Sequence, residues 1–391
     1  MITRKLYTFL FSLYFGISSI YWLPFINEKD LRIIKLSFFG VLVFLTIIQG
    51  GKLKNFDFIR GIFGPFGLLF LLFSHLFSSL FVEKSRIWDT AVDVFTFYLS
   101  MWMFGLLIIN KLLVVEKVLK ISFLILSVFI LFHIITVLLK MEVSIPDVNN
   151  SFESFKDIGF NLSRTGWSNG LSLYVPIGLF FFKDYKKWIP VLLIVYSQYL
   201  CGGRAGLSAS LLIIYSYIYR GKVSWSLFFF FVILLSVFTF YIEDFAEVLR
   251  IDRIESGVNA STLDDFSANR IVGFRYGIER WLESPFFGAG YINVSYEGVI
   301  LEGMDIHNFW IKMLAEYGII PIIFYLIFVF QIVRSASQFK LRGKDSRIVF
   351  LVLVGGLFTT MFEPNAIFGS FQNSAIWWFC AAIVLVEQKN K

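Results

Sequence analysis

Charged side chains are scarce in this 391-residue sequence: 16% of the residues are Asp, Glu, Lys or Arg, whereas 57% are hydrophobic. A water-soluble domain needs more polar surface than this balance supplies, so that class of protein is excluded. Histidine occurs three times and cysteine twice, at Cys201 and Cys380, without the spacing of a metal or redox site. The sequence also lacks a Walker motif, a dinucleotide-binding glycine fingerprint and zinc-ligand spacing.

What the sequence does contain is a series of apolar stretches of roughly 20 residues, the length that a helix needs to cross a bilayer. Hydropathy therefore predicts an all-α polytopic membrane protein with about 12 transmembrane helices. The first stretch follows Arg4 and Lys5 and runs through bulky residues into Pro24, which favours a retained helix over a cleaved signal peptide. The predicted spans are 6–26, 33–50, 61–82, 88–110, 118–139, 168–183, 188–201, 204–220, 225–242, 307–333, 348–363 and 371–387.

The distribution of lysine and arginine indicates the orientation of these spans. With the N-terminus inside, every predicted inside segment is basic, whereas the short outside segment 363–369 has no basic residue. The positive-inside rule therefore predicts that both termini are cytoplasmic. Because the sequence shows long apolar runs and not the alternating strands of an outer-membrane barrel, we expect the chain to lie in a bacterial inner membrane. The net charge of +7 is spread over loops, which fits contact with anionic bilayer lipids better than binding of nucleic acid.

One long outside segment late in the chain divides the sequence into three parts. Residues 1–242 form the transmembrane bundle of the first nine spans, residues 243–306 form a periplasmic loop element, and residues 307–391 supply the last helices. Within the loop element, 269–283 is typical of a helix and is followed by turn-forming residues at 284–290. Most of the polar chemistry of the sequence lies in this element and at its end.

Of the three histidines, His307 is the strongest candidate for a catalytic role. It opens span 307–333 at its outside end, where an imidazole can accept a proton near neutral pH, for example from a sugar hydroxyl. A helix cap or an interfacial side chain is the structural alternative. His75 and His133 lie inside apolar runs, and for both we favour a helix–helix hydrogen bond over a functional role.

Arg204 lies in a Cys-Gly-Gly-Arg-Ala-Gly segment at the outer end of a predicted span. A guanidinium is costly in lipid, so it should face a cavity or bind an anion; arginine binds phosphate bidentately, and the glycines would let the backbone approach a bulky ligand. An orientation anchor at the interface is the alternative. For Arg164, Arg275 and Arg280 a loop salt bridge competes with ligand binding, and for Glu316 a structural contact does.

Several of these elements occur in an order that resembles the O-antigen ligase and O-antigen polymerase superfamily. They are Gly-Arg-Ala-Gly at 203–206, the helix start at Arg270, Glu-Ser-Pro-Phe-Phe-Gly-Ala-Gly at 283–290, and His-Asn-Phe at 307–309 followed by Glu-Tyr-Gly at 316–318. The motifs cover roughly residues 197–330, and the similarity lies in their order and spacing together.

The resemblance implies a GT-C-like helical bundle that acts as a metal-independent glycosyltransferase without a cofactor. Its donor would be an undecaprenyl-diphosphate-linked oligosaccharide, bound at the periplasmic face. The resemblance implies that Arg204 and Arg270 hold the donor diphosphate and that His307 is the catalytic base. Arg164, Arg275 and Asn308 are further candidate substrate-binding residues; Arg164 and Arg275 have no secure counterparts among the motifs of the superfamily.

Two activities in this superfamily share the donor and differ in the acceptor. A polymerase extends the chain on a lipid-linked repeat unit, with a chain-length regulator protein as a further partner, whereas a ligase transfers the chain to the lipid A core. We favour the polymerase by analogy, because the modest length of segment 243–306, the Phe- and Ile-rich sequence and the divergent early helices resemble polymerases more than ligases. A flippase for the same lipid-linked glycans is a third alternative, although the sequence shows neither two related halves nor ionisable residues at mid-membrane depth.

Overall fold

The computed structural model describes residues 4–20, 28–50, 87–139, 164–182, 184–201, 203–218, 270–289, 306–339, 344–363, 367 and 371–389. Every regular element within these ranges is a helix, which confirms the predicted all-α class for this part of the chain. The predicted spans 61–82 and 225–242 lie outside the described residues.

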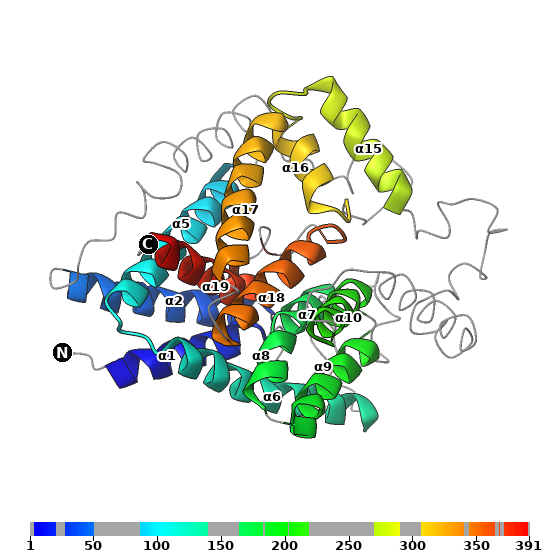
Figure 1. Cartoon of the computed structure of the whole chain (residues 1–391). Helices are drawn as coiled ribbons and strands as arrows, with labels where there is room; N and C mark the ends of the chain where they lie inside the picture. The colour runs from blue at the N-terminus through cyan, green and yellow to red at the C-terminus, as the bar shows by residue number, and fades with distance from the viewer. Residues whose placement is uncertain are drawn as a thin grey trace.

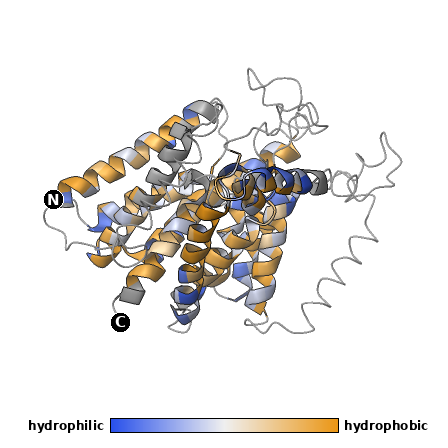
Figure 2. Cartoon of the chain, turned by 90° about the horizontal axis from the view of Figure 1, so that it is seen from above, coloured by the Kyte–Doolittle hydropathy of each residue, from blue (hydrophilic) through white to orange (hydrophobic). Residues whose placement is uncertain are grey.

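Among the described residues, two helices are long and apolar enough to cross a membrane: α6 (Val115–Leu138) and α17 (Ile319–Phe339). At about 1.5 Å per residue they extend roughly 30–36 Å, which matches a hydrocarbon core of about 30 Å. Both expose apolar side chains such as Val128 and Phe330. Hydrophobic residues cover most of the helices along their length (Figure 2). By length and composition, these two helices are candidate membrane spans.

Five other described helices that lie at predicted apolar spans pack around a common core (Figure 1). α1 packs against α6, α5 packs against α19, and α18 packs against both α17 and α19. Most of these helices are shorter in their apolar part than the two candidate spans. Their bounds are Arg4–Ser18 for α1, Glu28–Gly50 for α2, Ile87–Ile109 for α5, Lys344–Thr359 for α18 and Phe371–Lys389 for α19.

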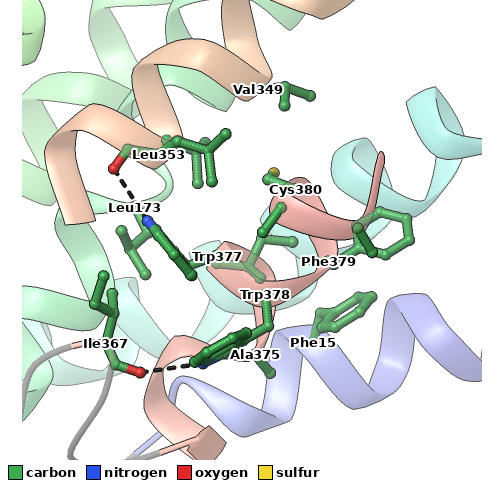
Figure 3. Close-up of a cluster of buried hydrophobic side chains, with 14 of the residues drawn as sticks. Phe15, Leu173, Val349, Leu353, Ile367, Ala375, Trp377, Trp378, Phe379 and Cys380 are labelled. Atoms are coloured by element: carbon green, nitrogen blue, oxygen red, sulfur yellow. Dashed lines mark hydrogen bonds between the residues drawn. The ribbon is translucent and has the colours of Figure 1, made fainter. Parts of the chain in front are cut away.

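The centre of this core is α19, which is buried along residues 374–386, as expected for a helix that is apolar on all sides. Its two indoles find polar partners within the core: Trp377 Nε1 donates to the Leu353 carbonyl at 3.0 Å, and Trp378 Nε1 donates to the Ile367 carbonyl at 3.1 Å (Figure 3). Phe379 packs against Phe15 of α1 with ring centroids 5.0 Å apart. These contacts fix α18 and the turn that follows it.

Two predicted spans are wrong as single helices. Span 168–183 is divided into α7 (Arg164–Ser172) and α8 (Val175–Phe181), and Pro176 in the first turn of α8 favours a new helix start because it has no N–H to donate. Span 307–333 is divided into α16 (Phe309–Tyr317) and α17 at Gly318, whose φ of 78° lies in the left-handed region that ends helices.

Other local predictions are confirmed. The two short spans around Gly203 appear as α9 (Trp188–Leu200), preceded by the 3₁₀ turn η2 (Asp184–Lys187), and α10 (Arg204–Ile218). The predicted helix in the late polar segment appears as α15 (Arg270–Glu283).

Candidate functional site

His307 lies beside a buried acid, Glu363, in the turn that follows α18. The distance from His307 Nδ1 to Glu363 Oε2 is 3.5 Å, and the two side chains are 27% and 5% exposed. A carboxylate buried to this extent is costly without a partner that balances its charge. The imidazole is thus partly open to solvent, and its Nδ1 faces the carboxylate of Glu363.

The start of α16 is held against the turn after α18 by a set of hydrogen bonds. Asn308 caps α16, since its Oδ1 accepts from the Ile311 N–H at 3.0 Å, and its Nδ2 donates to the Met361 carbonyl at 2.9 Å. The Phe309 N–H donates to the Thr360 carbonyl at 3.0 Å. These bonds position His307 against Glu363, and they give Asn308, a candidate substrate ligand by sequence, a capping and cross-linking role.

Glu363 is a site residue that sequence reasoning missed. In the sequence it lies at the boundary of the short outside segment 363–369, 56 residues away from His307. The available signal was its position: the segment has no basic residue and lies on the same predicted side of the membrane as His307.

The two motifs at 283–290 and 316–318 form one joint between backbone segments. The Ala289 N–H donates to the Ala315 carbonyl at 2.8 Å, and the Ile319 N–H donates to the Pro285 carbonyl at 2.9 Å. A Cβ on Gly318 would lie 2.3 Å from the Phe286 carbonyl oxygen, and Gly318 has a positive φ. These two motifs, which contribute to the resemblance to the superfamily, therefore have a structural role: they join the end of α15 to the end of α16.

Replacing Gly318 by alanine is expected to destabilise the protein by about 2–4 kcal/mol, because alanine disfavours this φ and its Cβ collides with backbone. Thermal unfolding of the detergent-purified protein measures the loss. Gly273→Ala is the matched control, since a Cβ there meets nothing within 4 Å and alanine is the better helix former. Equal melting temperatures for the two variants would contradict the assigned joint.

α15 runs beside α16 in the same direction (Figure 1). Gly277 lies against Ile311, where an added Cβ would be 2.6 Å from the isoleucine Cγ2, and eleven residues further along the chain Gly288 lies against Glu316. Arg270, the first residue of α15, is thus on the side of this joint where α16 begins and His307 lies. Of the arginines predicted in this region, Arg275 is exposed.

The structural alternatives are confirmed for two other charged residues of this region. Arg280 pairs with Glu283 at 2.7 Å, which is the salt bridge predicted as its alternative. Glu316 is buried and lies 3.9 Å from Lys312, one turn earlier on α16. The first ion pair lies within α15 and the second within α16.

Arg204 opens α10 and is exposed, and Gly203 and Gly206 on either side of it contact α7. A Cβ on Gly206 would lie 2.3 Å from the Ser168 carbonyl carbon, and Ser168 Oγ donates to the Gly203 carbonyl at 2.6 Å. Gln198 Nε2 donates to the Ser168 carbonyl at 2.8 Å. For Gly206, the close neighbour is therefore backbone of the same protein, whereas the sequence suggested room for a ligand.

α7, α9 and α10 pack together as one cluster, and a buried hydrogen-bond network joins this cluster to α6. His133 Nδ1 lies 2.6 Å from Ser197 Oγ, and Trp167 Nε1 donates to the same oxygen at 3.1 Å. The predicted helix–helix hydrogen bond of His133 is thus confirmed, between α6 and α9. His75 lies outside the described residues.

α7 and α10 begin at the same end of this cluster, and their first residues are Arg164 and Arg204. Ser168 lies against Gly206 near the helix starts, and the Phe180 and Tyr217 rings meet 5.0 Å apart towards the other end. α18 connects this cluster to His307, because α18 packs against α7 and α10 and the turn after it carries Glu363.

Among the described residues, no three His, Cys, Asp or Glu side chains are close enough together to hold a metal ion. No protein-family model matches the sequence, and no curated protein matches it. The site is therefore defined by the chemistry of its own residues.

Proposed function

We propose that this protein is an O-antigen polymerase of the bacterial inner membrane. At the periplasmic face it transfers a growing undecaprenyl-diphosphate-linked O-antigen chain onto a lipid-linked repeat unit. The observation that carries the proposal is the 3.5 Å pair of partly exposed His307 and buried Glu363, in a chain whose motif order resembles the O-antigen ligase and polymerase superfamily. The proposed topology has about 12 spans with both termini in the cytoplasm, and the element 243–306 lies in the periplasm.

In the proposed reaction His307 accepts the proton of the acceptor hydroxyl while the hydroxyl oxygen attacks C1 of the donor sugar. The bond between C1 and the diphosphate oxygen breaks, and the lipid diphosphate leaves with its electron pair. Glu363 stabilises the imidazolium that forms. Arg204 and Arg270 hold the diphosphate, whose negative charge grows during departure and is stabilised by fixed guanidinium groups.

The donor explains why such a site belongs at helix ends on one face of a membrane protein. A polyprenyl chain stays in the bilayer, whereas the diphosphate and the glycan need a polar environment. Arg204 and His307 both stand at the starts of helices rather than within them. A ligase would use the same donor and the same residues with the lipid A core as acceptor, so it is the second candidate.

The glycan profile of a strain that lacks this protein tests the proposal and separates it from its alternatives. We expect lipopolysaccharide that carries single repeat units, because capping continues without polymerisation. Bare core with accumulated lipid-linked polymer would instead indicate a ligase. Accumulated single units on the cytoplasmic side would indicate a flippase, and an unchanged profile would contradict all three. Restoring the gene on a plasmid is the control.

A further inference from the structure

α15 leaves part of its surface apolar and uncovered. One face of the helix packs on α16 through Phe274, Tyr276 and Gly277. On the other face Ile278 and Leu282 are 43% and 61% exposed, and the turn after the helix exposes Phe286 and Phe287 at 64% and 41%. Four large apolar side chains exposed within ten residues are unusual in a segment predicted to lie in the aqueous periplasm.

This apolar surface continues directly into a candidate membrane span. The Ile319 N–H at the start of α17 donates to the Pro285 carbonyl, so Phe286 and Phe287 lie beside the end of that span. α17 in turn exposes Ile323, Leu326 and Phe330. The C-terminal end of α15, which carries Leu282, therefore lies near the end of this candidate span.

The charge beside the apolar residues fits a lipid surface. Arg275 is exposed, and at about 100° per residue it lies within about 20° of Leu282 around the helix. An arginine on an apolar face can lay its stem along the apolar side chains and extend its guanidinium to the phosphates of the lipid headgroups.

From this we infer that α15 is an interfacial helix: Ile278, Leu282 and Phe286 enter the outer leaflet, and Arg275 binds phosphates of the lipid headgroups. The inference rests on the membrane placement in the proposed function and is independent of its glycosyl-transfer chemistry. It deepens that function, since it places Arg270 and the neighbouring His307 at the depth where the diphosphate of a membrane-bound donor lies.

Nitroxide labels on the full-length protein in phospholipid vesicles test this inference. The two native cysteines, Cys201 and Cys380, are buried, so a cysteine introduced at Leu282 or Phe286 is the accessible one. We expect a label at either position to be broadened by oxygen, which dissolves in lipid, and to lose its broadening by a water-soluble nickel complex. A label at Glu283, about 100° around the helix from Leu282, is the matched control and should keep the nickel effect.

A label at Leu326 of α17 supplies the reference for membrane insertion. If the Leu326 label reports lipid while the Leu282 and Phe286 labels report water, α15 is not interfacial and the membrane placement stands. If the label at Leu326 also reports water, the proposed membrane placement fails together with the inference. Shielding of the Leu282 label from both oxygen and nickel would mean that protein covers this face, which also overturns the inference.

Discussion

Replacing His307 by alanine is expected to abolish chain extension while the protein stays folded in the membrane. General base catalysis contributes about 10²–10⁴-fold to a rate, so the transfer should fall by at least about 100-fold. The side chain is partly exposed and its partner among the described residues is the Glu363 carboxylate, so little packing is lost. The measurements are the lipopolysaccharide ladder of cells that carry the variant and transfer by the purified protein.

Glu363→Gln separates the role of the acid from that of the imidazole. The amide keeps the shape of the side chain and removes the charge that stabilises the imidazolium, so we expect a smaller loss of rate than in the alanine variant of His307. The double variant His307→Ala/Glu363→Gln is the folding control, because it removes the buried carboxylate charge together with the imidazole. Its melting temperature shows whether an unbalanced buried charge destabilises the single His307→Ala variant. Long glycans of normal abundance from a stably folded His307→Ala protein would remove the catalytic assignment.

The helical class and several element positions could be predicted from the sequence because local patterns determine them. Apolar runs indicate helices directly, and the Gly-Gly break after Cys201 indicates the separation of α9 from α10. The breaks at Tyr174 and Gly318 were missed because a hydropathy window averages over single residues. Each break is set by backbone geometry, namely a proline in the first turn of α8 and a positive φ at Gly318.

Within the candidate site, the sequence indicated single candidate residues but not the residues that contact them in the structure. His307 was recognisable because it is a rare polar residue at an outside helix end. Its partner Glu363 was not, because the pair joins two segments that are distant in sequence, and hydropathy contains no signal for such a contact. Gly206 shows the same limit: its sequence suggested access for a ligand, but the neighbour is Ser168 of α7.

Arg204→Lys is the second substitution for which we expect a large effect. Lysine keeps the positive charge but loses the planar fork that binds two phosphate oxygens at once. Loss of one charge-assisted hydrogen bond costs about 1.5–3 kcal/mol, which corresponds to a fall in transfer rate of roughly 10- to 100-fold. Because the bonds strengthen as the diphosphate leaves, turnover should fall more than the apparent affinity for the donor.

Arg334→Lys is the matched control for this substitution. Arg334 is an exposed arginine near the end of α17 on the predicted cytoplasmic side, remote from the proposed donor site, so the same exchange there should leave transfer unchanged. If Arg204→Lys also transfers at the normal rate, the guanidinium at the start of α10 anchors the helix at the membrane surface. The diphosphate would then have to be held by other residues, with Arg270 at the start of α15 as the first to be tested.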